Sequence, residues 1–406
     1  MTLTLLIDLD DTLLTNNIET FLPAYLKALG RHMVDYVAPE SMTHHLMRAT
    51  KAMVTNNTAD LSLERSFDGV FYPAIGRTKE ELQTVIEKFY DDVFPQLQPL
   101  TSPRPEAVKL VEGALHQGHT LVVATNPLFP KKAILHRLRW AGLDPDEINF
   151  ALITTYECFH YAKPNPAYFA EILAQLGWPS QPAVVIGNSL EDDLIPAACL
   201  GLPVYWVIEP QSELPPPPLP EGFHPLSASG SLAEIPAWID RVDAAGLRQE
   251  FKTPQAMLAV LKSTPAAMDT LCLNLNERQW KDRPQPNAWS LTEIICHLRD
   301  VDREVNIPRM ERVIQEKDPF VPGVNSDQWA EERKYFLEDG PTALREFIEV
   351  RGKLITMLEE LPEASWQLPA RHAIFGPTRL QELVSFTAMH DRTHVQQALE
   401  TIRTLA

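Results

Sequence analysis

The sequence predicts a doubly wound α/β domain with a parallel sheet and a helical cap, followed by an all-α four-helix bundle. In the first half, short apolar runs rich in Val, Ile or Leu alternate with helical stretches, as buried parallel strands do. A long, mostly helical segment at about 17–100 interrupts this alternation directly after the first run. After about Ala244 the strand-like runs stop and the pattern becomes helical.

Five apolar runs define the predicted sheet. They cover residues 3–7, 120–124, 151–154, 183–186 and 204–208. Proline and glycine mark the helices between them: Pro105 and Pro166 suit a first helical turn, and Gly118 and Gly201 follow helix ends. In a sheet of this class, function lies at the carboxyl ends of the strands, and the inserted segment at 17–100 is placed to cover them.

The chain divides into two predicted domains, as its 406 residues suggest. The α/β domain covers 1–243, a linker covers 244–252, and the bundle covers 253–406. Its four helices are expected near 254–277, 291–315, 341–361 and 379–404. Ser290 and Glu293 form a capping box at the start of the second helix, which Pro308 should kink or shorten.

The charge, the cysteine content and the apolar runs indicate which partners, which cysteine sites and which cellular location to expect. A formal net charge of -18 disfavours nucleic acid and anionic membranes as partners. The four cysteines are widely spaced, which indicates reduced thiols, with neither a disulfide framework nor a zinc knuckle. The N-terminus has no basic leader, and no apolar run is long enough to span a membrane. We expect a soluble, cytoplasmic protein.

A carboxylate cluster follows the first predicted strand. Asp8 and Asp10 lie two residues apart, so extended backbone would place both side chains on one face. Two such carboxylates do not readily ionise together without a cation, so a divalent metal or a shared proton is expected, and oxygen ligands suit Mg²⁺. A solvated acidic turn accounts for about half of such short motifs.

Three further polar sites favour the functional interpretation. Thr125 ends the second apolar run, Lys163 follows the third, and the fourth leads into an acidic cluster at 187–193. Because parallel strands end at the same edge of a sheet, these groups should converge with Asp8.

These four motifs, in this order, resemble those of the haloacid dehalogenase-like hydrolase superfamily over about residues 1–243, with the insertion corresponding to a helical C1-type cap. The resemblance implies that Asp8 is the nucleophile that forms an aspartyl-phosphate, and that Asp10 is the acid/base partner. Thr125 and Asn126 would bind phosphoryl oxygens, and Lys163 would neutralise charge.

The same resemblance implies the metal site and the reaction class. Mg²⁺ would be held by Asp8, the backbone carbonyl of Asp10, Asn188 and Asp193. Dehalogenases of this superfamily lack the second Asp, because halide leaves without a proton; Asp10 therefore favours phosphate-ester hydrolysis. Asn188 stands where the family usually has Asp, which removes one negative charge and should weaken Mg²⁺ binding.

The helical half carries a second candidate site. His390 and His394 are spaced i, i+4 on one face of the fourth predicted helix, and His297 lies on the second. Three separate histidines with no common role are the simplest alternative. Facing helices that contribute one and two imidazoles can instead form a three-nitrogen site suited to Zn²⁺ or Ni²⁺.

Residues 253–406 resemble the DinB-like four-helix bundle superfamily, which includes metal-dependent thiol-transferase relatives. The likeness lies in WSLTEIICHLRDVD around His297, in MHDRTHVQQ around His390 and His394, and in the landmarks Trp329, Arg351 and Gly376. It implies that the three histidines are the ligands of a divalent metal.

The sequence therefore predicts a Mg²⁺-dependent phosphatase that acts on a small phosphorylated metabolite and is fused to a metal-binding bundle. One alternative is a sensor or adaptor whose hydrolase domain is weakened by Asn188. Another is a thiol-dependent transferase activity in the bundle. A homodimer formed through the bundle is left open.

Overall fold

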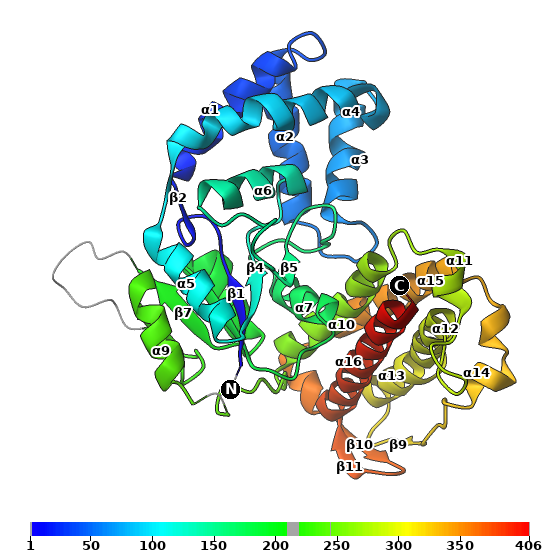
Figure 1. The fold of residues 1–406 in the computed structure, drawn as a ribbon. Helices are drawn as coiled ribbons and strands as arrows, with labels where there is room; N and C mark the ends of the chain where they lie inside the picture. The colour runs from blue at the N-terminus through cyan, green and yellow to red at the C-terminus, as the bar shows by residue number, and fades with distance from the viewer. Residues whose placement is uncertain (1, 209–218, 244, 406) are drawn as a thin grey trace. The chain divides into compact units, whose positions relative to one another are not determined.

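The computed structural model describes residues 2–208, 219–243 and 245–405, and groups the chain into two compact units (Figure 1). The N-terminal unit comprises residues 1–57, 61–165 and 179–250. The C-terminal unit comprises 58–60, 166–178 and 251–406, so it includes one helix from within the predicted first domain. Ala244, the first residue of the predicted linker, lies outside the described residues.

A six-stranded parallel sheet is the centre of the N-terminal unit, with strand order β5-β4-β1-β6-β7-β8. Its strands are β1 (Thr4–Ile7), β4 (Thr120–Val123), β5 (Leu152–Ile153), β6 (Ala183–Gly187), β7 (Val204–Val207) and β8 (Ala228–Gly230). Each predicted apolar run forms one strand, and the predicted α/β class is confirmed. All four residues of β1 are buried, and β4 and β6 pair with it on either side, so β1 is a central strand of the sheet.

Helices lie between the strands of this sheet and after its last strand, β8. They are α5 (Pro105–His116), α6 (Lys131–Trp140), the π-helix η3 (Leu190–Leu194), α8 (Ile195–Cys199), the 3-10 helix η4 (Leu232–Glu234) and α9 (Ile235–Arg241). Pro105 occupies the first turn of α5, as predicted, where its missing N–H leaves no hydrogen bond unmade.

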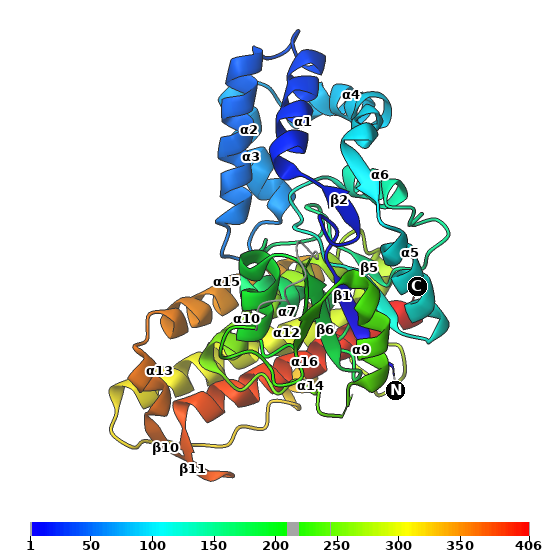
Figure 2. The same cartoon turned by 90° about the vertical axis from the view of Figure 1, so that its left-hand side faces the viewer.

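The inserted segment folds as a helical cap over the carboxyl end of β1 (Figures 1 and 2). It contains α1 (Ile18–His32), α2 (Pro39–Val54), α3 (Leu63–Ile75), α4 (Lys79–Lys88), the π-helix η1 (Phe89–Val93) and the 3-10 helix η2 (Phe94–Leu100). Its two ends are joined, because β2 (Leu14–Asn16) pairs antiparallel with β3 (Thr101–Pro103). The insertion therefore leaves and re-enters the sheet domain at one place.

The C-terminal unit is a four-helix bundle with short additions, and the predicted bundle is confirmed. The long helices are α10 (Pro254–Leu271), α12 (Leu291–Val301) continued by the π-helix η5 (Asp302–Asn306) and α13 (Ile307–Gln315), α15 (Gly340–Glu359) and α16 (Leu380–Leu405). Within it α12 packs against α15, and α10 against α15 and α16. Ser290 and Glu293 form the expected capping box, and the helix axis is interrupted by η5 just before Pro308.

The remaining elements of this unit are short, apart from α7 (Pro166–Gln175). They are α11 (Glu277–Lys281), β9 (Phe320–Val321), α14 (Trp329–Glu332), η6 (Tyr335–Leu337), η7 (Glu363–Gln367), β10 (Pro369–His372) and β11 (Gly376–Arg379). α7 packs against α10, and every residue from Ala167 to Gln175 is buried. A helix that is buried on all its faces belongs to the interior of a unit, which explains why α7 groups with the bundle.

Candidate active site and metal centre

Two ion pairs that share one lysine lie at the edge of the sheet where the parallel strands end. They join Lys163 to Asp8 and to Asp193. Asp8 directly follows β1, and its amide donates to the carbonyl of Ile186 on the neighbouring strand at 2.9 Å. The Lys163 Nζ lies 2.7 Å from Asp8 Oδ1 and 2.5 Å from Asp193 Oδ1. All three side chains are buried. A buried ammonium between two carboxylates satisfies charges that would otherwise be costly to remove from water.

Glycine allows Asp193 to approach the end of β6. Asp193 lies on η3, and its Oδ2 accepts a hydrogen bond from the amide of Ser189 at 3.0 Å. A Cβ at Gly187 would lie 2.3 Å from this same oxygen, so a side chain at position 187 would displace the carboxylate. Burial raises the pKa of Asp193, which Lys163 opposes and the charge of Asp8 reinforces.

Asn188 lies beside this group and faces the loop after β1. Its Oδ1 accepts a hydrogen bond from the Thr12 hydroxyl at 3.2 Å, and its carbonyl accepts one from Trp206 Nε1 at 3.0 Å. An uncharged amide therefore occupies the position between the end of β6 and the first acidic loop.

Asp10 is held by a different set of partners from those of Asp8. Its Oδ1 forms an ion pair with Arg137 Nη2 and accepts a hydrogen bond from Asn16 Nδ2 at 2.8 Å. The Asp10 side chain is 36% exposed, whereas that of Arg137 is 2% exposed. Burial lowers the pKa of Arg137 to about 10, and the charge of Asp8 opposes this shift. Even so, the guanidinium is charged at neutral pH, and it fixes the position of the Asp10 carboxyl group.

Thr125 and Asn126 follow β4, the strand next to β1. The amide of Ala124 donates to the Ile7 carbonyl at 2.7 Å, and the Thr125 carbonyl accepts the Thr154 hydroxyl at 2.7 Å. Asn126 Oδ1 is buried without a hydrogen-bond partner among the described residues. Both residues therefore lie at the sheet edge from which Asp8 emerges.

Three histidines converge in the C-terminal unit. His390 Nε2 lies 3.0 Å from His297 Nε2 and 3.1 Å from His394 Nε2. Within the described part of the chain, this triad is the one group of three or more His, Cys, Asp or Glu side chains placed to share an ion. Burial lowers the pKa of His297 to about 3 and those of His390 and His394 to about 4. All three imidazoles are therefore neutral near pH 7.

Neighbouring side chains orient the triad. His394 Nδ1 donates to Gln397 Oε1 at 2.8 Å, which leaves the lone pair on Nε2 facing the other two histidines. The Trp289 ring stacks on His394, with 5.8 Å between ring centroids and 9° between planes, and lies 4.8 Å from His297. The aromatic ring closes one side of the triad.

A buried ion-pair network lies next to the triad. Arg351 Nε lies 2.6 Å from Asp302 Oδ2, and Arg351 Nη2 lies 2.9 Å from Asp391 Oδ1. None of the three side chains is exposed. Asp391 follows His390 on α16, and Asp302 begins the π-helix η5. The network therefore joins three of the long helices at the level of the histidines.

Comparison with family models decides the classification. The model for haloacid dehalogenase-like hydrolases matches residues 2–201, and the model for the DinB superfamily matches residues 261–398. Residues 2–201 belong to the haloacid dehalogenase-like hydrolases, and residues 261–398 belong to the DinB superfamily. No curated protein matches the chain.

Solved structures similar to each part are known. The hydrolase part is similar to a HAD phosphatase from Thermococcus onnurineus (19% identity, 59% of this chain and 98% of that chain, TM-score 0.36). It is also similar to a 2-haloacid dehalogenase from Pseudomonas syringae pv. Tomato (20% identity, 59% of this chain and 99% of that chain, TM-score 0.41). The DinB part is similar to YfiT from Bacillus subtilis, which is described as a probable metal-dependent hydrolase (18% identity, 37% of this chain and 86% of that chain, TM-score 0.34). In the described part of this chain, no helix is both long and apolar enough to cross a membrane.

Two parts of these sites were not predicted from sequence. In the hydrolase part, Arg137 lies on α6 among Lys and Arg residues that sequence alone would place in solvent. Its spacing from Ala133 and Ile134, both buried, was the available signal. In the DinB part, Trp289 and the acidic partners of Arg351 were not recognised as neighbours of the histidines.

Proposed function

We propose that the hydrolase part is a Mg²⁺-dependent phosphatase that hydrolyses a small phosphate ester through an aspartyl-phosphate on Asp8. The main support is the position of Lys163, whose ammonium lies between the carboxylates of Asp8 and Asp193. A nucleophilic carboxylate beside a fixed cation can approach a dianionic phosphoryl group with less repulsion.

The residues around Asp8 suit a two-step reaction. Asp8 attacks phosphorus, and the ester oxygen leaves with a proton from Asp10. Asp10 then takes a proton from the water that hydrolyses the aspartyl-phosphate. The ion pair with Arg137 and the hydrogen bond from Asn16 fix the position of the Asp10 carboxyl group for both proton transfers. Thr125 and Asn126 would donate to phosphoryl oxygens, from the loop after β4.

The oxygen donors at this edge fit Mg²⁺. They are the side chains of Asp8, Asp193 and Asn188, together with the main-chain carbonyl of Asp10, and hard oxygen ligands are those that Mg²⁺ prefers. When bound, Mg²⁺ would supply positive charge to the phosphoryl oxygens. Asn188 contributes a neutral oxygen, so we expect weaker Mg²⁺ binding than with an aspartate at this position.

The DinB part would hold a second divalent metal, Zn²⁺ or Ni²⁺, through His297, His390 and His394. A metal–nitrogen distance of about 2.0–2.1 Å implies a spacing of roughly 3.3 Å between nitrogens in a tetrahedral site. The observed spacings of 3.0 and 3.1 Å are only slightly shorter. Neutral imidazoles are the form that binds a metal, and the low pKa values keep them neutral.

A phosphatase assay with a panel of phosphorylated metabolites and Mg²⁺ tests the proposal. Asp8→Asn should reduce turnover to background, because the amide cannot form the intermediate, and Asp10→Asn should lower kcat roughly 10²–10⁴-fold. Glu191→Gln is the matched control, since Glu191 is an exposed carboxylate on η3, and it should keep wild-type activity. Equal activity of wild type and Asp8→Asn would exclude this mechanism.

The contrasting hypothesis is a sensor or adaptor that binds a metal through the triad. It predicts stoichiometric metal at the histidines and no turnover that depends on Asp8. A thiol-dependent transferase in the DinB part predicts transfer that is lost in His390→Ala while phosphatase activity persists. The acidic charge of -18 supports the proposal that neither nucleic acid nor an anionic membrane is a partner.

A further inference from the structure

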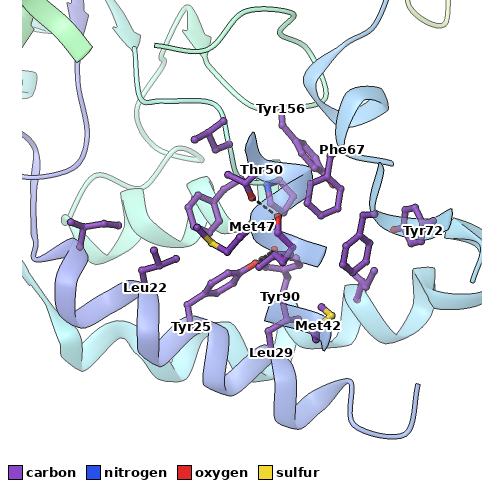
Figure 3. A pocket seen from close by; sticks show the side chains of 17 residues that line it. Leu22, Tyr25, Leu29, Met42, Met47, Thr50, Phe67, Tyr72, Tyr90 and Tyr156 are labelled. Atoms are coloured by element: carbon purple, nitrogen blue, oxygen red, sulfur yellow. Dashed lines mark hydrogen bonds between the residues drawn. The ribbon is translucent and has the colours of Figure 1, made fainter. Parts of the chain in front are cut away.

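The cap and the loops after β4 and β5 enclose an apolar cavity of about 210 Å³ (Figure 3). Its walls come from α1, α2, α3, the end of α4 with η1, and the loops that contain Phe129 and Tyr156. None of the seventeen described residues that line it is charged. Seven of the seventeen are aromatic and most of the others are aliphatic or methionine, so the cavity offers mainly dispersion and hydrophobic contacts.

Three hydroxyl groups of the cavity wall, those of Tyr25, Thr50 and Tyr90, have hydrogen-bond partners. Tyr25 and Tyr90 share a hydrogen bond of 3.0 Å between their phenol oxygens, and the Thr50 hydroxyl donates to the Leu46 carbonyl at 3.0 Å (Figure 3). Burial raises the pKa of Tyr25 to about 12, so this phenol is neutral. A ligand group rich in hydroxyls would lose its hydration here without full compensation, whereas an apolar group would not.

The cavity lies next to the residues proposed for catalysis. Phe129, which lines it, follows Asn126 by three residues in the loop after β4. The Phe129 ring centroid lies 5.4 Å from Arg137 Cζ, and the Arg137 guanidinium is the ion-pair partner of Asp10. Phe129 is therefore part of the cavity wall and also contacts Arg137, the ion-pair partner of the group that would protonate the leaving alcohol.

We propose that the substrates are phosphate monoesters of apolar alcohols, and that the cavity receives one aromatic ring or branched hydrocarbon group of the alcohol. This inference rests on the proposed phosphatase function and specifies its substrate class. A cavity of about 150 Å³ holds benzene, so 210 Å³ accommodates a group of ring size. Esters of hydroxylated alcohols, such as sugar phosphates, lack the group that the cavity fits.

Binding of non-hydrolysable phosphonates tests this inference without requiring turnover. Benzylphosphonate and a hydroxylated alkylphosphonate of similar size are titrated into the full-length protein with Mg²⁺ by calorimetry. We expect benzylphosphonate to bind at least tenfold more tightly, because its ring removes a large apolar surface from water when it enters the cavity. Equal or weaker binding of benzylphosphonate overturns the proposal, even if the phosphatase assay succeeds. Preferential binding supports it, even if no turnover is found.

Two substitutions on α2 test whether the preference for the benzyl group arises in the cavity. Thr50→Phe fills the cavity, whereas Val54→Phe adds the same ring one helical turn away, at a residue that is 37% exposed and does not line it. Thr50→Phe should remove the benzyl preference while methylphosphonate binding is unchanged, and Val54→Phe should keep the preference. Circular dichroism confirms folding of each variant. Should Thr50→Phe not fold, Leu22→Ala enlarges the cavity and should shift the preference to naphthylmethylphosphonate; an unshifted preference overturns the proposal.

Discussion

The two candidate sites solve the problem of burying polar groups in opposite ways. At the edge of the hydrolase sheet, the polar groups are ionic, and each buried acid has a cation beside it: Lys163 lies between Asp8 and Asp193. In the bundle, the three histidines carry no cationic charge, because burial lowers their pKa values to about 3 to 4. The first arrangement suits a dianionic substrate and a hard cation, and the second suits a metal that prefers nitrogen.

In the bundle, buried charged side chains lie next to the neutral histidines. Among its buried ions, Arg351 forms ion pairs with both Asp302 and Asp391 directly beside the histidines. Asp391 follows His390 in sequence, yet the carboxylate binds Arg351. The ionic network and the triad are thus neighbours with separate tasks, since the network joins helices while the triad presents lone pairs.

Removal of Arg351 should have the largest effect on the bundle. Arg351→Met leaves two fully buried carboxylates without their cation, which costs about 3–5 kcal/mol in comparable buried pairs. Denaturant unfolding, followed in the absence of metal, measures the loss. Lys353→Met is the control, because Lys353 lies on the same helix in an exposed pair with Glu349 and should change stability by less than about 0.5 kcal/mol. Similar losses in both variants would mean that the network adds nothing specific.

Acidification should have a smaller effect, which is specific to the triad. A histidine with a pKa below its ordinary value of 6.5 stabilises the fold above about pH 6.5, and this contribution is lost progressively as pH falls towards the folded value of about 4. Metal-free wild type should therefore lose stability between pH 7.5 and 5, and His390→Leu should lose less over the same interval. Both are measured by denaturant unfolding. An identical pH dependence in the two proteins would show that His390 is not held neutral.

The sequence predicted the elements whose patterns are strictly local. The five continuous apolar runs became parallel strands, and the helix of the histidine pair, expected at 379–404, forms at Leu380–Leu405. The strand β8, with the sequence ASG, could not be predicted, because it has no apolar run and depends on pairing with β7. The sheet β9–β11 in the bundle was missed for a similar reason, since β9 has only two residues.

The residues of the candidate sites could be predicted only where the order of motifs along the chain indicated that they would meet. Asp8 and Lys163 are 155 residues apart, and only the parallel topology indicated that they would meet. The spacing of Arg137 from buried residues of α6 could have indicated its burial, but no local pattern indicates that it pairs with Asp10. The cap cavity is a still clearer case, because its walls combine four cap helices with two loops of the sheet domain.

The division between an oxygen site and a nitrogen site is tested most directly by locating metals in crystals. Crystals of the full chain grown with Mn²⁺, as a substitute for Mg²⁺, and with Zn²⁺ would be measured at each metal's absorption edge. We predict Mn²⁺ beside Asp8 and Asp193, and Zn²⁺ at His297, His390 and His394. Absence of Mn²⁺ from the carboxylates, with both metals at the histidines, would contradict the account of the hydrolase site.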